Sequence, residues 1–155
     1  MNFWNKYKPI ILQVALALAA GGLATLLSGG QELYRQLEKP PLSPPGWVFP
    51  VVWSILYVLM GIAAGLVMRS RDYDRRGAMR RYYLQLGINV LWPMLFFRFE
   101  LLTVALVWLA LLVAAVTLTW RSFRRISETA GWLLVPYLVW CLFALYLNAG
   151  FVILN

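Results

Sequence analysis

The sequence lacks histidine altogether and has a single cysteine, Cys141. Without histidine, the commonest metal ligand, haem ligand and neutral-pH general base are missing. A single cysteine excludes an internal disulfide and a site that needs several thiolates. We therefore expect no metal site, no required cofactor and no histidine-dependent catalysis.

Acidic residues are also few. Asp and Glu number 6 against 14 Lys and Arg, so the net charge is +8. All six carboxylates fall in predicted loops or at predicted helix ends, which leaves no buried acid for a proton relay or an ion-coupled pump. The sequence shows neither a Ser-His-Asp arrangement nor a glycine loop that would hold phosphate. Binding is the expected activity, and whether the chain is also an enzyme stays open.

Apolar residues, by contrast, dominate the chain. They make up 62% of the residues, whereas about 45–50% is usual for soluble domains, and the mean hydropathy is +0.70. Apolar runs predict helices at about 9–29, 46–68, 79–97, 101–123 and 130–154, and most reach the roughly 20 residues that cross a bilayer. We predict an all-α integral membrane protein: one domain (1–155) forming a bundle of five transmembrane helices, with an outer loop at residues 30–45.

The cations are distributed unevenly along this predicted topology. Those on the side of the N-terminus are Lys6, Lys8, Arg69, Arg71, Arg75, Arg76, Arg80, Arg81, Arg121, Arg124 and Arg125. The positive-inside rule places this side, and the N-terminus, in the cytoplasm. Membrane insertion and contact with anionic lipid explain the charge better than nucleic acid does. We expect a multi-pass protein of a bacterial cell membrane and no nucleic-acid partner.

The outer loop ends in a proline-rich run, in which Pro40, Pro41, Pro44 and Pro45 precede Trp47. Proline fixes φ and removes a backbone donor, so this run has few accessible conformations. An aromatic helix follows it directly. We expect the loop at residues 30–45, called the lid loop below, to close the mouth of a cavity, with Pro40, Pro44, Pro45 and Trp47 in its lid.

Three predicted helices carry polar or aromatic residues at spacings of three to four, so each set lies on one helix face. These sets are Phe49, Trp53 and Tyr57; Gln85, Asn89, Trp92 and Phe96; and Tyr137, Trp140, Ala144 and Asn148. Amides are unfavourable against lipid, so the faces should point inward. They form either interhelical hydrogen bonds and ordinary core, or a pocket for a large planar hydrophobic ligand that stacks on tryptophan. Their convergence beneath the lid loop favours the pocket.

Several motifs resemble the translocator protein family (TspO/MBR), also called tryptophan-rich sensory proteins or peripheral-type benzodiazepine receptors. They are Lys39-Pro40…Pro44-Pro45-x-Trp47-x-Phe49-Pro50-x-x-Trp53-x-x-x-Tyr57, Asn89-x-x-Trp92 with Phe96-Phe97, and Leu134-Val135-Pro136-Tyr137-x-x-Trp140-x-x-x-Ala144-x-x-x-Asn148. The similarity extends over essentially the whole chain. Each motif alone is unspecific, and their combination is highly specific.

The resemblance implies a five-helix membrane bundle, often dimeric, that binds porphyrins such as protoporphyrin IX, sterols, and isoquinoline or benzodiazepine-type drugs. The family's pocket residues carry over onto Phe49, Trp53, Tyr57, Asn89, Trp92, Trp140, Ala144 and Leu147. In some members, tryptophans that match Trp53 and Trp140 are implicated in light-dependent breakdown of protoporphyrin IX. Three functions therefore stay open: a receptor or carrier for tetrapyrroles, a porphyrin-degrading activity with Trp53 and Trp140 as its catalytic residues, and a membrane scaffold without a ligand.

The chain departs from the family pattern in places. Leu42 stands in the lid loop where tryptophan is common, and Pro41 replaces an aromatic residue of some members, so stacking surface is lost there. The cholesterol-recognition pattern is absent because neither Lys nor Arg follows Tyr146, although sterol or lipid stays among the expected ligands. A homodimer is also expected. Two small-residue motifs, Ala17–Gly21 and Gly61–Gly65, would suit helix contacts either inside the bundle or between protomers.

Overall fold

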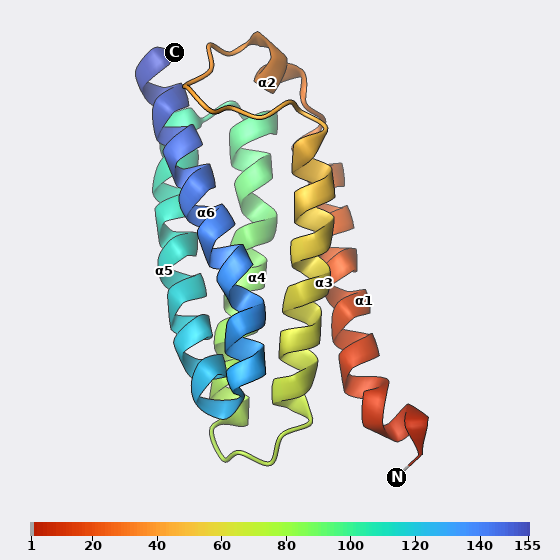
Figure 1. Cartoon of the computed structure of the whole chain (residues 1–155). Coiled ribbons are helices and arrows are strands. Elements are labelled where there is room, and N and C mark those ends of the chain that lie inside the picture. Colours follow the sequence, from red (N-terminus) through yellow and green to blue (C-terminus); the bar gives the residue numbers. More distant parts are fainter. Residues whose placement is uncertain (1) are drawn as a thin grey trace.

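The computed structural model describes residues 2–155. Its elements in chain order are α1 (Phe3–Ser28), α2 (Glu32–Gln36), α3 (Val48–Met68), α4 (Arg75–Pro93), the π-helical segment η1 (Met94–Arg98), α5 (Leu102–Ile126) and α6 (Glu128–Leu154). Five long helices lie side by side, and the short α2 crosses one end within the lid loop (Figure 1). The predicted all-α fold is confirmed.

Some predicted helix bounds were wrong because the helices continue past their apolar cores. α1 begins at Phe3 and not near residue 9, and the Asn2 side chain accepts a hydrogen bond from the Asn5 backbone N–H (2.8 Å) at its start. α4 begins at Arg75 and not near residue 79, and α5 reaches Ile126 and not residue 123. Hydropathy marks the part of a helix that can lie in hydrocarbon, whereas polar and charged turns extend it at either end.

Four helices are long and apolar enough to cross a membrane: α1, α3, α5 and α6. The third predicted span, at 79–97, is not among the four found in residues 2–155, because α4 begins with Arg75, Arg76, Arg80 and Arg81. The apolar part of α4 is short and continues into η1, where the Phe99 backbone N–H donates a hydrogen bond to the Met94 carbonyl. Pro93 at this junction cannot donate the helical bond to the Asn89 carbonyl, which accounts for the change in winding.

The two ends of the bundle differ in character (Figure 1). The N-terminus, the α3–α4 connection and the α5–α6 turn lie at one end, and the lid loop and the C-terminus lie at the other. All the cations assigned above to the N-terminal side therefore gather at one end. α4 and α5 run antiparallel beside each other, since only residues 99–101 connect η1 to α5.

The two small-residue motifs are used inside the bundle. A Cβ built on Gly61 would lie 2.5 Å from the Val14 Cα, and one built on Gly65 would lie 2.4 Å from the Ile10 Cα. The backbones of α1 and α3 therefore touch, as GxxxG faces allow in membranes. Ala17, in the other motif, is fully buried. Neither motif locates an interface between protomers.

This close approach predicts the effect of adding one methyl group. Gly61→Ala should separate α1 from α3 and lower the free energy of unfolding by about 1–3 kcal/mol, because the clash is with backbone that cannot rotate away. Gly87→Ala is the matched control: its Cβ would meet nothing within 4 Å, so it should be neutral or stabilising by up to about 1 kcal/mol. Thermal unfolding in a neutral detergent measures both. Equal midpoints for the two variants would contradict the contact.

Candidate functional site

A cavity of about 280 Å³ lies between α1, α3 and α4, beneath the start of the lid loop. It is lined by Gly21, Ala24, Thr25, Ser28, Gly30, Gln31, Phe49, Pro50, Trp53, Tyr57, Asn89, Trp92, Pro93 and Phe97. Most of these groups are apolar or aromatic, and the amides and hydroxyls are few. This composition is typical of sites for hydrophobic small molecules.

The aromatic wall of the cavity comes from one face of α3. Phe49, Trp53 and Tyr57 follow at four-residue spacing, and the ring centroids of Trp53 and Tyr57 are 5.7 Å apart. Opposite them stands Gly21 of α1. A Cβ there would lie 2.6 Å from the Tyr57 ring, so glycine leaves the space that this ring fills.

A chain of buried hydrogen bonds forms the floor of the cavity. The Tyr57 hydroxyl donates to Asn89 Oδ1 (2.5 Å), and Asn89 Nδ2 donates to the Tyr137 hydroxyl (2.7 Å). That hydroxyl in turn donates to Gln85 Oε1 (2.6 Å). The chain joins α3, α4 and α6, and it fixes which faces of these helices point inward. These groups therefore form interhelical hydrogen bonds, which was one of the two predicted alternatives. Two of the four residues, Tyr57 and Asn89, also line the cavity.

A second void, of about 20 Å³, lies on the far side of Phe49, Trp92 and Phe97, which line both spaces. Its other lining residues are Tyr34, Phe96, Ala144, Leu147, Asn148 and Phe151. Trp92 is held between the two spaces by its indole N–H, which donates a hydrogen bond to Asn148 Oδ1 (3.1 Å). Of the predicted residues of α6, Ala144, Leu147 and Asn148 thus line the void and not the larger cavity.

Trp140 lines neither space. Its ring packs edge-on against Phe49 (centroids 5.9 Å apart) and Trp53 (6.5 Å), behind the aromatic wall. Its buried Nε1 has no hydrogen-bond partner within residues 2–155. An unpaired buried donor is uncommon in proteins.

The structure thus separates the predicted pocket residues into three groups. Phe49, Trp53, Tyr57, Asn89 and Trp92 line the cavity; Phe96, Ala144 and Leu147 line the void with two of these; and Trp140 lies behind them. The contribution of α1 was missed in the sequence. One face of α1 carries small residues at spacings of three, one and three: Gly21, Ala24, Thr25 and Ser28. Such a face can border an open space as well as a neighbouring helix.

The lid loop is attached to the bundle at several points. The Asn155 side chain binds the loop through the Glu38 backbone. Oδ1 of Asn155 accepts a hydrogen bond from the Glu38 N–H (3.0 Å), and Nδ2 of Asn155 donates one to the Glu38 carbonyl (2.9 Å). The Tyr146 hydroxyl donates to the Pro41 carbonyl (2.7 Å). Pro40 packs on Gly150, where a Cβ would lie 2.6 Å from the proline ring. All three contacts are to the C-terminal part of α6 or to Asn155, which follows it.

The inner side of the loop is held by Tyr34 of α2, whose hydroxyl donates to the Pro44 carbonyl. Burial raises the pKa of Tyr34, so the hydroxyl stays protonated and remains a donor. Gln31 Nε2 donates to the Gly46 carbonyl (3.0 Å) and so ties α2 to the start of α3. Leu42, at the departure from the family pattern, is 82% exposed with a φ of 71°.

Pro44, Pro45 and Trp47 line the outer side of the lid and not the cavity below. Together with Arg35 and Lys39 they border an open hollow of about 650 Å³. Trp47 is 68% exposed there. The Lys39 ammonium lies 5.0 Å from the centre of the Tyr34 ring, and Arg35 pairs with Glu32 (3.7 Å) on the surface. Both cations therefore lie at the outer hollow and do not line the cavity.

In the comparison with known proteins, the TspO/MBR family matches residues 10–154. The chain belongs to the TspO/MBR family. Membership confirms the resemblance seen in the sequence motifs, and the apolar helices make this TspO/MBR chain a multi-pass integral membrane protein.

TspO/MBR relatives from distant organisms are similar over most of their length. The tryptophan-rich protein TspO of Chlorobaculum tepidum is 35% identical over 150 residues, covering 94% of this chain and 95% of that protein. The protein of the same name from Archaeoglobus fulgidus is 35% identical over 155 residues, covering 100% and 99%. The translocator protein of Homo sapiens is 36% identical over 122 residues, covering 77% and 72%.

The attachment of the lid loop predicts a proteolysis result. Gly150→Ala should displace Pro40 from α6 and increase the rate of tryptic cleavage after Arg35 several-fold. Trypsin should not cleave after Lys39 in either protein, because a proline follows it. Gly22→Ala, whose added Cβ would meet nothing within 4 Å, is the control and should be cleaved like the wild type. Mass spectrometry of timed digests follows the cut. Identical rates in both variants would show that this contact does not hold the loop.

Proposed function

We propose that the chain is a membrane receptor or carrier that binds a porphyrin, such as protoporphyrin IX, or a related planar hydrophobic molecule of isoquinoline or benzodiazepine type. The observation that carries the proposal is the cavity, which Trp53 and Trp92 line from two helices and Tyr57 and Asn89 line at its floor. Indole faces would stack on a flat ligand, and the amide and hydroxyl would bind its polar atoms. Arg35 and Lys39, on the outer side of the lid loop, would meet carboxylates of a ligand whose edge extends past the loop.

The size of the cavity sets a condition on binding. At about 280 Å³ it lies just below the range of about 300–1,000 Å³ for ligand pockets. A tetrapyrrole would gain room if the shared rings of Phe49 and Trp92 moved toward the void, where Ala144 and Leu147 would become contacts. In this proposal the cavity and the void are two parts of one site, which includes all the predicted ligand-binding residues except Trp140.

The proposal includes a position in the membrane. α4 with η1 is the fifth span, because it lies inside the bundle beside four helices that are apolar enough to cross. The arginine-rich end faces the cytoplasm, together with the N-terminus, and the site then opens in the outer half of a bacterial cell membrane. A homodimer belongs to the proposal as well, through a surface other than the Gly61–Gly65 face.

Filling the cavity tests the proposal. Ala24→Phe should weaken protoporphyrin IX binding at least about tenfold, because a new ring on α1 would occupy the space before Trp53. Leu26→Phe is the control on the same helix, since Leu26 is 78% exposed. Tryptophan-fluorescence quenching gives both affinities. Equal affinities would place the ligand elsewhere, and an absence of saturable binding in the wild type would leave the scaffold interpretation.

Light-dependent porphyrin degradation is the second candidate function. It is favoured by the pair of Trp53 and Trp140, whose rings lie 6.5 Å apart at an interplanar angle of 89°. Trp53 lines the cavity and would donate an electron to a photoexcited porphyrin, and Trp140 behind it would re-reduce the Trp53 radical. Dissolved dioxygen would be the oxidant consumed in the breakdown of the macrocycle, and a soluble reductant would restore Trp140. No metal or further cofactor enters this proposal.

Product analysis under illumination separates degradation from simple binding. The wild type should convert bound protoporphyrin IX to a new pigment, and Trp53→Phe and Trp140→Phe should each slow this conversion at least about tenfold while binding is largely kept. Trp132→Phe, a 69% exposed position, is the control. Intact porphyrin in every sample would leave binding alone as the function.

A further inference from the structure

A second hollow lies at the opposite end of the bundle, between α4 and α5. It has a volume of about 430 Å³ and is open to the surroundings. It is lined by Arg81, Leu118, Arg121, Ser122, Arg124 and Arg125. Four of its six lining side chains are thus cations, and the function proposed above uses none of them.

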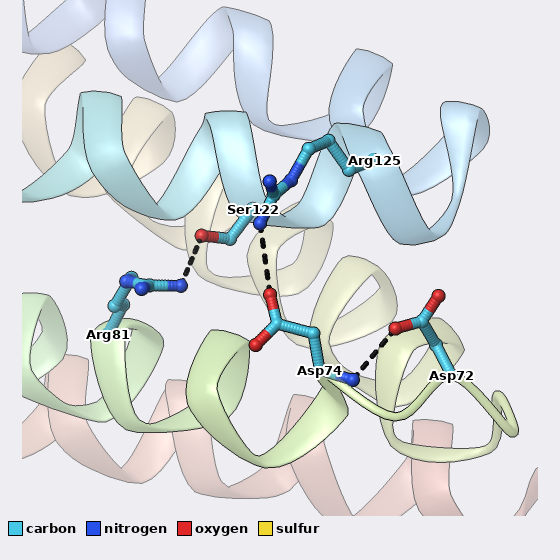
Figure 2. A network of polar contacts seen from close by, with 5 residues as sticks. All are labelled: Asp72, Asp74, Arg81, Ser122 and Arg125. Carbon is cyan, nitrogen blue, oxygen red and sulfur yellow. Dashed lines mark hydrogen bonds and ion pairs between the residues drawn. The ribbon is translucent and has the colours of Figure 1, made fainter.

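Only one of these four cations is neutralised by a carboxylate within residues 2–155. Arg125 pairs with Asp74 (3.0 Å), and the other aspartate nearby, Asp72, accepts a hydrogen bond from the Asp74 backbone N–H (2.8 Å; Figure 2). Arg81 donates from Nη1 to the neutral Ser122 hydroxyl (2.8 Å), which orients it toward α5 without cancelling its charge. The hollow therefore keeps a large excess of positive charge.

The remaining cations, Arg121 and Arg124, form no ion pair in the described chain. Arg124 is held in place by Trp120, with its guanidinium carbon 5.4 Å from the ring centroid. Guanidinium groups bind phosphate through pairs of parallel N–H donors, and clustered arginines suit a phosphate better than a single carboxylate. The hollow is thus chemically complementary to a phosphate group.

The hollow also adjoins an apolar surface. Leu118, which lines it, is 54% exposed, and Leu111 (48%) and Val107 (68%) continue the same face of α5 away from the charged end. Their spacings of seven and four residues place them on one stripe. A soluble phosphate compound has no apolar chain that would contact such a stripe, whereas a lipid acyl chain would lie along it.

From these contacts we infer that the hollow between α4 and α5 binds the phosphate headgroup of an anionic phospholipid of the cytoplasmic leaflet, with one acyl chain along Leu118, Leu111 and Val107. Basic hollows between membrane helices are a recurrent way to hold anionic headgroups. Arg81 and Arg121 would contact the phosphate directly, and Ser122 would position Arg81. The inference does not depend on the ligand of the outer cavity.

Native mass spectrometry of the full chain in a neutral detergent tests this site. The probes are palmitoyl-oleoyl phosphatidylglycerol and phosphatidylcholine with the same acyl chains. The wild type should bind the first phosphatidylglycerol molecule at least about tenfold more tightly than phosphatidylcholine, and Arg81→Gln/Arg121→Gln should abolish most of that preference. The control is Arg69→Gln/Arg71→Gln, which removes the same charge from exposed positions at the same end. This control variant should keep the preference for phosphatidylglycerol.

Other outcomes would overturn the inference. Equal losses in both double variants would mean that only the general positive field attracts lipid. Displacement of phosphatidylglycerol by millimolar inorganic phosphate, with Leu118→Asn binding lipid like the wild type, would indicate a soluble phosphate ligand. A wild type without preference would show that the hollow binds no headgroup. Should the double variant unfold at a lower temperature, Arg121→Gln alone decides, because Arg121 has no ion-pair partner in residues 2–155 to lose.

Discussion

The buried chain of hydroxyls and amides from Tyr57 through Asn89 and Tyr137 to Gln85 is the interaction on which the rest of the structure depends. Hydrocarbon offers no partner for such groups, and each would be unfavourable by several kcal/mol if it faced lipid. The chain therefore fixes the rotation of α3, α4 and α6 about their axes. Trp53 and Trp92, one turn away from Tyr57 and Asn89, must then face inward as well.

The packing of α1 against α3 explains how a cavity can persist in a small bundle. α1 approaches α3 so closely at Gly61 and Gly65 that the two helices touch by backbone. Toward the lid loop, α1 presents small residues such as Ala24 and Thr25, which leave the space before Trp53 unfilled. Close packing at one end and small side chains at the other thus give a cavity beneath a loop that Asn155 and Tyr146 hold in place.

Much of this arrangement follows from the sequence alone. Hydropathy predicted the helices, the helical spacing of Trp53 and Tyr57 predicted an inward aromatic face, and the proline run predicted a rigid loop above it. The position of Trp140 behind the wall did not follow, because spacing assigns a residue to a helix face and not to one of two adjacent spaces. The part played by α1 was missed because small residues predict close packing and open space equally well. The apolar run predicted at 79–97 is not among the helices of residues 2–155 that are apolar enough to cross a membrane, because arginines occupy the first turns of α4.

The most direct test of the account is fluorine NMR of the protein labelled with 5-fluorotryptophan, titrated with protoporphyrin IX. Single Trp→Phe variants assign the resonances. The account predicts large ring-current shifts for Trp53 and Trp92, which line the cavity, and small ones for Trp4 and Trp132, which are exposed at the other end of the bundle. Saturable shifts confined to Trp4 and Trp132 would contradict this assignment, because the ligand would then lie outside the cavity.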